Sequence, residues 1–276
     1  MLAKLIAFDL RTYRKMLWKP LLICLGIFLI ATVTTRYVEG ITIFIAIMAL
    51  IVAAGFIVYT MVSHYYRHFY THQGYLTHTL PTTPSQKLWA KFISGFILHV
   101  LAIVGVGLGL YLLFYVSFRD LMHSKFFMDM IKGFFDAIGP ATVWVFVISL
   151  FLAYISFFAT YSLSISVGMN KFLQRFGGGG IALAFVGIYL VQQLVNLVNF
   201  FTPLSVRIFL NPRWHQMIQV VNEQPFGSMS ILAESDDLVP EIAYMDVGVL
   251  AIVYSIVFVI FSFLWVRREI KLINLR

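Results

Sequence analysis

Six long apolar segments whose interiors contain no Asp or Glu limit how this chain can fold. The segments are residues 19–36, 41–62, 92–116, 141–168, 178–201 and 247–266. A helix of about 20 apolar residues crosses the roughly 30 Å hydrocarbon core of a bilayer, and a charged group at that depth is costly. We therefore expect an all-α membrane protein with six transmembrane helices.

The composition excludes a water-soluble globule. Only 12% of the residues are charged and 61% are hydrophobic, whereas soluble proteins carry about 25% charged residues. The net charge of +8 does not indicate a nucleic-acid partner, because the Lys and Arg lie in short clusters between apolar runs. We expect membrane lipid to surround the apolar segments. The single cysteine, Cys24, lies within an apolar run, where a packing role is expected.

The distribution of charge predicts the orientation in the membrane. With the N-terminus inside, the inner segments hold 14 Lys and Arg against 2 acids, and the outer segments hold 6 against 10. Cytoplasmic loops of membrane proteins carry the excess of Lys and Arg. We expect a multi-pass protein of the cell membrane with both termini in the cytoplasm.

The remaining segments complete the expected organisation. Residues 1–18 form an amphipathic pattern, so we expect a retained helix in the cytoplasmic interface, followed by a six-helix transmembrane domain over 19–276. The outer loops are expected to be helical. Apolar and charged residues alternate at helical spacing over 117–140, which predicts an interfacial helix. Residues 202–246 contain four prolines, and short broken helices are expected there.

Motifs for catalysis are missing from the sequence. The four glycines 177–180 are followed by Ile181 and Ala182 rather than by the Lys and Ser or Thr of a phosphate-binding loop, so they indicate a flexible or closely packed start to the fifth span. The spans offer no carboxylate, and His99 is the only histidine well inside one. We predict no catalytic residue and no enzymatic activity on this chain.

Three histidines recur every four residues after the second span: His64, His68 and His72. Two histidines at this spacing can share a metal ion, but aromatic and basic residues surround them and the neighbouring sequence has no carboxylate. We therefore predict no metal site and favour a solvated or partner-facing extension of the helix.

A row of polar side chains follows one face of the fifth span: Tyr189, Gln192, Asn196 and Asn199. Amides in hydrocarbon need hydrogen-bonding partners or water. Two interpretations are about equally supported, namely hydrogen bonds between helices and the wall of a substrate pathway.

The inner loop between the second and third spans reads HQGYLTHTLPTTPSQKLWAKF over residues 72–92. Gly74 permits a turn, Pro81 and Pro84 break the backbone, and Ser85 can cap a short helix that runs through Leu88 into the third span. This pattern predicts a rigid cytoplasmic knob, the kind of lever that a membrane protein driven by a separate motor needs.

The same loop resembles that of the ABC-2 family of six-span ABC exporter permease subunits, in its small Gram-positive type. The matching positions are Gly74, Tyr75, Leu76, Thr79, Leu80, Pro81, Lys87 and Lys91. The similarity extends to the amphipathic first helix, the six spans, and the longest outer loop between spans five and six.

The resemblance implies a half-transporter without ATPase activity of its own. Two copies of the chain would form a homodimer and bind two ATP-binding cassette subunits, which carry ATP and Mg. These subunits would dock on the loop and on the N-terminal helix. The coupling residues implied are Gly74, Tyr75, Leu76, Leu80, Pro81 and Lys87. The cargo expected is a hydrophobic or amphipathic compound, such as a peptide, antibiotic or lipid.

An alternative from another class is a non-transporting membrane immunity or sensor protein. It would bind a toxic peptide at the outer surface, and segments 117–140 and 202–246 would then be the functional parts. The presence or absence of an ATP-binding partner discriminates the two.

Overall fold

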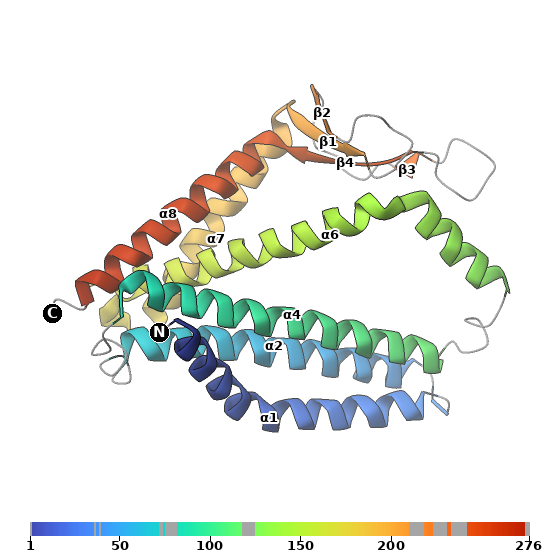
Figure 1. The fold of residues 1–276 in the computed structure, drawn as a ribbon, viewed down its shortest axis with the longest axis horizontal. Helices are drawn as coiled ribbons and strands as arrows, with labels where there is room; N and C mark the ends of the chain where they lie inside the picture. Colours follow the sequence, from blue (N-terminus) through green and yellow to red (C-terminus); the bar gives the residue numbers. More distant parts are fainter. Residues whose placement is uncertain are drawn as a thin grey trace. The chain divides into compact units, whose positions relative to one another are not determined.

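The computed structural model describes residues 2–35, 37–38, 40–71, 74, 82–117, 125–209, 218–222, 231–232 and 242–273. Its long elements are the helices α1 (Leu2–Thr34), α2 (Ile41–Tyr70), α4 (Pro84–Ser117), α6 (Lys125–Gly168), α7 (Gly178–Phe201) and α8 (Val249–Ile273) (Figure 1). Within this part of the chain, six helices are long and apolar enough to cross a membrane. The predicted all-α fold with six spans is confirmed.

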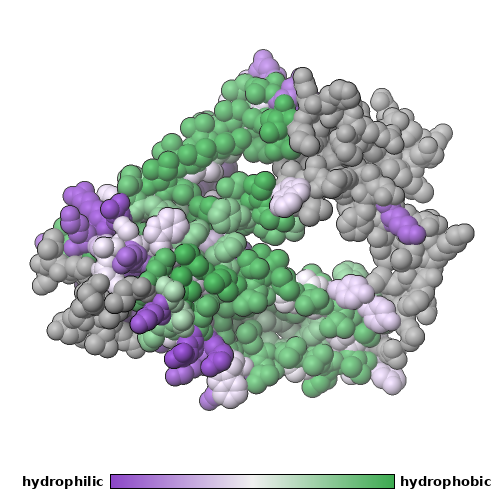
Figure 2. Space-filling view, viewed as in Figure 1, coloured by the Kyte–Doolittle hydropathy of each residue, from purple (hydrophilic) through white to green (hydrophobic). Residues whose placement is uncertain are grey.

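Large apolar side chains point outward along these helices. Ile30, Leu101 and Leu194 are each at least 60% exposed, and hydrophobic surface runs along the helices in Figure 2. Exposed apolar surface of this extent is unfavourable in water, whereas lipid tails are as apolar as leucine. The chain is a multi-span membrane protein.

The chain divides into two compact units. One comprises Met1–Ser124 with Arg267–Arg276, and the other comprises Lys125–Val266. The first unit contains α1, α2 and α4, which pack against one another. The second contains α6, α7, most of α8 and a small β-sheet.

Helix α1 covers both the predicted interfacial segment and the first predicted span. It continues from Leu2 to Thr34 with Pro20 inside it, and Figure 1 draws it with a bend. A proline inside a helix removes one backbone hydrogen bond and commonly kinks the axis. Further along, Phe28 packs against Ala46 and Ala49 of α2, because the small alanines let the helices approach. Cys24 is buried, as its predicted packing role requires.

Helix α4 begins with a reciprocal cap. The Gln86 backbone N–H donates to Thr83 Oγ1, and the Thr83 N–H donates to Gln86 Oε1, both at 3.3 Å. This is a capping box, and Pro84 occupies the first helical position, where a missing N–H costs nothing. The helix runs through Leu88 into the third span, as predicted, but Ser85 does not cap it, because Ser85 lies inside the first turn of α4.

Helices α6 and α7 form a tight hairpin, because the turn between them is short. A short 3-10 helix, η1 (Gln174–Phe176), fills the turn. A Cβ on Gly168 would lie 2.5 Å from the Ile181 Cα, and one on Gly180 would overlap the Leu173 carbonyl. Gly177 adopts a φ of 55°, a conformation that favours glycine. Within the glycine run, Gly180 is therefore closely packed and Gly177 serves the turn, which supports a closely packed start to the fifth span.

Two expectations for the loops need correction. Residues 125–140 are helical, as predicted, but they form the first part of α6 rather than a helix of their own. Residues 202–246 do not form short broken helices where the structure describes them. They contribute the antiparallel strands β1 (Ser205–Phe209), β2 (Ile218–Val221), β3 (Ile231–Leu232) and β4 (Ile242–Gly248), in the order β2-β1-β4-β3.

Strands β1 and β4 are joined by a charged pair as well as by their backbones. Arg207 lies directly opposite Asp246, and its guanidinium donates to both carboxylate oxygens, at 2.9 Å and 3.0 Å. This bidentate geometry is the favourable one for Arg and a carboxylate. Extended pairing satisfies the backbone here, and the sheet leads directly into α8 at Val249.

Candidate functional site: a buried ionic cluster

Asp9 is a buried acid on α1. Asp9, Tyr13 and Leu17 follow one another at four-residue intervals, so they share one face of the helix, and each is 3% exposed. The cations around them, such as Arg11, Arg14 and Lys15, are exposed. The amphipathic pattern of residues 1–18 thus has an acid in the middle of its buried face.

His64 meets Asp9 from α2. Its Nε2 atom lies 2.9 Å from Asp9 Oδ1, and its ring packs edge-on against Tyr13, with 4.6 Å between the ring centroids. His64 is 1% exposed. The prediction of a solvated or partner-facing histidine face is therefore wrong for His64. His68, one turn further on, is half-buried, and His72 lies outside the described residues.

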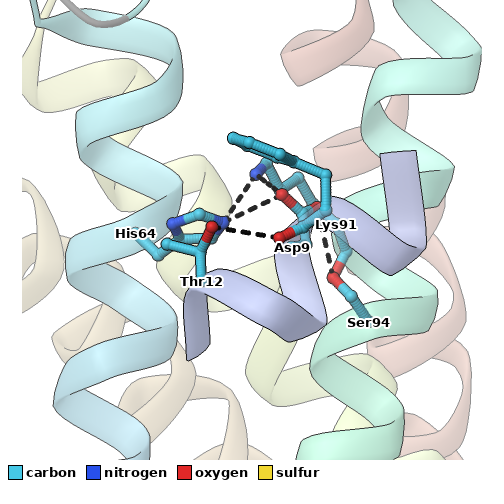
Figure 3. Close-up of polar contacts among 6 residues, drawn as sticks. Asp9, Thr12, His64, Lys91 and Ser94 are labelled. Atoms are coloured by element: carbon cyan, nitrogen blue, oxygen red, sulfur yellow. Dashed lines mark hydrogen bonds and ion pairs between the residues drawn. The ribbon is translucent and has the colours of Figure 1, made fainter. Parts of the chain in front are cut away.

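Lys91 completes the cluster from α4. Its ammonium donates to Asp9 Oδ1 at 2.6 Å and lies 2.9 Å from His64 Nε2. The Ser94 hydroxyl lies 3.4 Å from Asp9 Oδ2 and 3.3 Å from the Lys91 carbonyl. Figure 3 shows these side chains converging between the three helices. We call Asp9, His64 and Lys91 the ionic cluster.

The charges of the ionic cluster balance. The Asp9 carboxylate and the Lys91 ammonium cancel, and a neutral His64 fits between them because an imidazole nitrogen can donate or accept. Burying two charges is costly, and only close geometry with further hydrogen bonds offsets that cost. Breaking such a pair by removing one member leaves an uncompensated buried charge. The cluster therefore fixes α1 specifically against α2 and α4.

The geometry of the ionic cluster indicates whether its side chains could bind a metal ion. Asp9, His64 and His68 offer ligand atoms within 4.8 Å of one another, so a carboxylate does accompany the histidines, contrary to the sequence-based argument. However, Lys91 Nζ lies within 3 Å of both Asp9 and His64. The ammonium already occupies the position between these ligands, and a divalent ion beside it would be repelled.

The predicted coupling loop is only partly described. The Gly74 N–H donates to the Thr71 carbonyl at 2.7 Å, and a Cβ on Gly74 would lie 3.0 Å from the Phe69 carbonyl oxygen. Gly74 thus lies in a close turn at the end of α2. Lys87 is 2% exposed on the first turns of α4. The remaining predicted coupling residues lie outside the described residues: Tyr75, Leu76, Leu80 and Pro81, together with Thr79.

The polar row on α7 divides into two pairs. The Gln192 amide donates to Thr160 Oγ1 of α6 at 3.1 Å, and Asn199 Oδ1 accepts from the Ala251 N–H in the first turn of α8 at 3.1 Å. Tyr189 and Asn196 are exposed. Hydrogen bonding between helices accounts for Gln192 and Asn199, whereas Tyr189 and Asn196 leave the substrate-pathway interpretation open.

No family model, no curated protein and no solved structure matches the chain.

Proposed function

We propose that this chain is the transmembrane permease subunit of an ATP-driven ABC exporter. Two copies pair in the cell membrane with both termini in the cytoplasm, and two separate ATP-binding subunits supply ATP and Mg. The cargo is a hydrophobic or amphipathic compound. The ATPase activity resides on the partner subunits, and this chain supplies the route across the membrane.

The strongest support for the proposal is the position of Lys91 on α4. Helix α4 starts at Pro84, within the segment 72–92 that resembles the ABC-2 coupling loop, and two turns into α4 the Lys91 ammonium contacts Asp9 of α1 and His64 of α2. A lever needs a stiff connection to the parts that it moves. Because the ionic cluster joins three helices beside this loop, a force on the loop would displace all three together.

The test is an uncoupling experiment on the complete complex in proteoliposomes. The double variant Pro81→Ala with Lys87→Ala alters the loop, and Ser85→Ala in the same region is the matched control. A panel of amphipathic peptides is first screened for one that stimulates ATP hydrolysis by the wild-type complex. The double variant should still bind the ATPase and hydrolyse ATP at the basal rate, but peptide stimulation and export should be lost. Unchanged stimulation and export would contradict the coupling role.

The small β-sheet favours a second candidate. Its Arg207–Asp246 pair and the β2-β1-β4-β3 pairing give the segment between the last two spans a defined surface. A membrane immunity or sensor protein would use such a surface to bind a toxic peptide without transport. This candidate requires no ATP-binding partner, so purification of the chain alone in a form that protects cells from the peptide would favour it.

A further inference from the structure

The nitrogen Nε2 of His64 faces two different groups at the same distance. It lies 2.9 Å from Asp9 Oδ1, an acceptor, and 2.9 Å from Lys91 Nζ, a donor. A single imidazole nitrogen carries either a proton or a lone pair, so it can make only one of these hydrogen bonds at a time. Whether Nε2 carries a proton therefore decides which neighbour it binds, and in the imidazolium form Nε2 always carries one.

The surroundings of His64 are positive apart from one acid. Helix α1 presents Asp9 and Tyr13, helix α4 presents Lys91, and helix α2 adds His68 and the positive charge of Arg67. With His64 neutral, the charges of Asp9 and Lys91 cancel. A proton added to His64 gives the buried cluster a net positive charge, which is unfavourable unless one cation withdraws.

A small pocket of about 40 Å³ adjoins the ionic cluster. Its lining is mainly apolar, with Leu5, Phe8, Phe69 and Ala90 beside the titratable groups Asp9, His68, Lys87 and Lys91. The rings of His68 and His64 lie 4.0 Å apart, so His68 is the titratable group that lies between this pocket and His64.

We propose that His64 is a proton-binding site, and that proton uptake exchanges the partner of Asp9 from Lys91 to His64. The incoming proton makes His64 an imidazolium, whose Nε2–H donates to Asp9. Lys91 keeps its ammonium protons and withdraws from Asp9, so no covalent bond other than the new N–H forms or breaks. Helix α1 then remains bound to α2 but is released from α4.

The direction of the pH effect follows from the charge balance. The three-helix arrangement takes up no extra proton, so it is favoured at higher pH and lost as the pH falls. Histidines in proteins change charge mainly between about pH 5 and 8, which sets the range to examine. This inference concerns the ionic cluster and holds independently of whether the chain is a permease.

The test uses solid-state NMR on the full chain in lipid nanodiscs, with labelled His, Lys and Asp. His64→Gln assigns the His64 ring signals, and the contact between Lys91 Nζ and the Asp9 carboxylate carbon is followed from about pH 8 to about pH 5. We expect the contact to be lost as both His64 nitrogens become protonated. In His64→Gln the contact should persist at all pH values, and in His68→Gln it should be lost as in the wild type.

Two results would overturn the proposal. One is a His64 ring that becomes doubly protonated while the Lys91–Asp9 contact remains. The other is a contact that is lost on acidification equally in the wild type and in His64→Gln, which would assign the effect to another group. Neither measurement uses an ATPase, so failure here is distinct from failure of the exporter proposal.

Discussion

The ammonium of Lys91 lies 2.6 Å from Oδ1 of Asp9, although 82 residues separate them in the sequence. Both side chains are at most 5% exposed. A buried contact between opposite charges on α1 and α4 is sensitive to the loss of either partner. Its consequences for stability can be measured directly.

Asp9→Asn should destabilise the protein by about 3–5 kcal/mol, because it leaves the Lys91 ammonium buried without a carboxylate. The measurement is reversible chemical unfolding in detergent. The double variant Asp9→Asn with Lys91→Met removes both charges and should recover at least half of the loss. A single variant as stable as the wild type would show that the pair contributes nothing to the attachment of α1.

The capping box at the start of α4 gives a second prediction. Thr83→Ala removes the hydroxyl that accepts from the Gln86 N–H and should cost about 0.5–2 kcal/mol. Ser85→Ala is the matched control, and a change within about 0.5 kcal/mol is expected because Ser85 does not cap the helix. If unfolding experiments showed that Ser85→Ala destabilises the protein more than Thr83→Ala does, Ser85 would be the cap instead.

Gly248 tests the junction between the sheet and α8. A Cβ at this position would overlap the Asn199 side-chain amide, which would have to turn away and lose its hydrogen bond from the Ala251 N–H, so Gly248→Ala should destabilise by about 0.5–1.5 kcal/mol, the net contribution of a typical hydrogen bond. Gly187→Ala is the control, since no atom lies within 4 Å of a Cβ built there. Equal melting temperatures for Gly248→Ala and Gly187→Ala would contradict the close approach of Gly248 to the Asn199 side chain.

The polar row on α7 can be divided by function. Gln192→Leu breaks the bond to Thr160 and should cost about 0.6 kcal/mol, the average for hydrogen bonds between membrane helices. Asn196→Leu changes an exposed amide, so stability should be unchanged while peptide stimulation of ATP hydrolysis changes if α7 lines the pathway. If Asn196→Leu leaves stimulation as in the wild type, the substrate-pathway role of Asn196 is wrong.

The spans could be predicted from the sequence, but the ionic cluster could not. Hydropathy is a local property, and the absence of acids from the six apolar segments sufficed to place helices there. Asp9 lies in a segment rich in cations, where an acid is expected on a solvated face. Its burial depends on the packing of α1 against α2 and α4, which no local pattern encodes. The spacing of Asp9, Tyr13 and Leu17 is the one signal that could have indicated it.

The errors at the loops have a related cause. Four prolines over 202–246 argued against long elements, yet strands of two to five residues fit between them and the seven-residue β4 follows the last one. Strand pairing depends on partners distant in sequence, such as Arg207 and Asp246, so periodicity in a short segment does not reveal it. At α4, both Thr83 and Ser85 are good caps, and only the hydrogen bonds with Gln86 distinguish them.

The most direct test of the exporter proposal is the composition of the complex purified from native membranes. Native mass spectrometry of the tagged chain, extracted in mild detergent with ATP and Mg, counts the subunits. We predict two copies of this chain with two copies of an ATP-binding subunit, both for the wild type and for the Pro81→Ala, Lys87→Ala variant, which is expected to lose coupling but not assembly. Recovery of the wild-type chain without any ATP-binding protein would contradict the proposal.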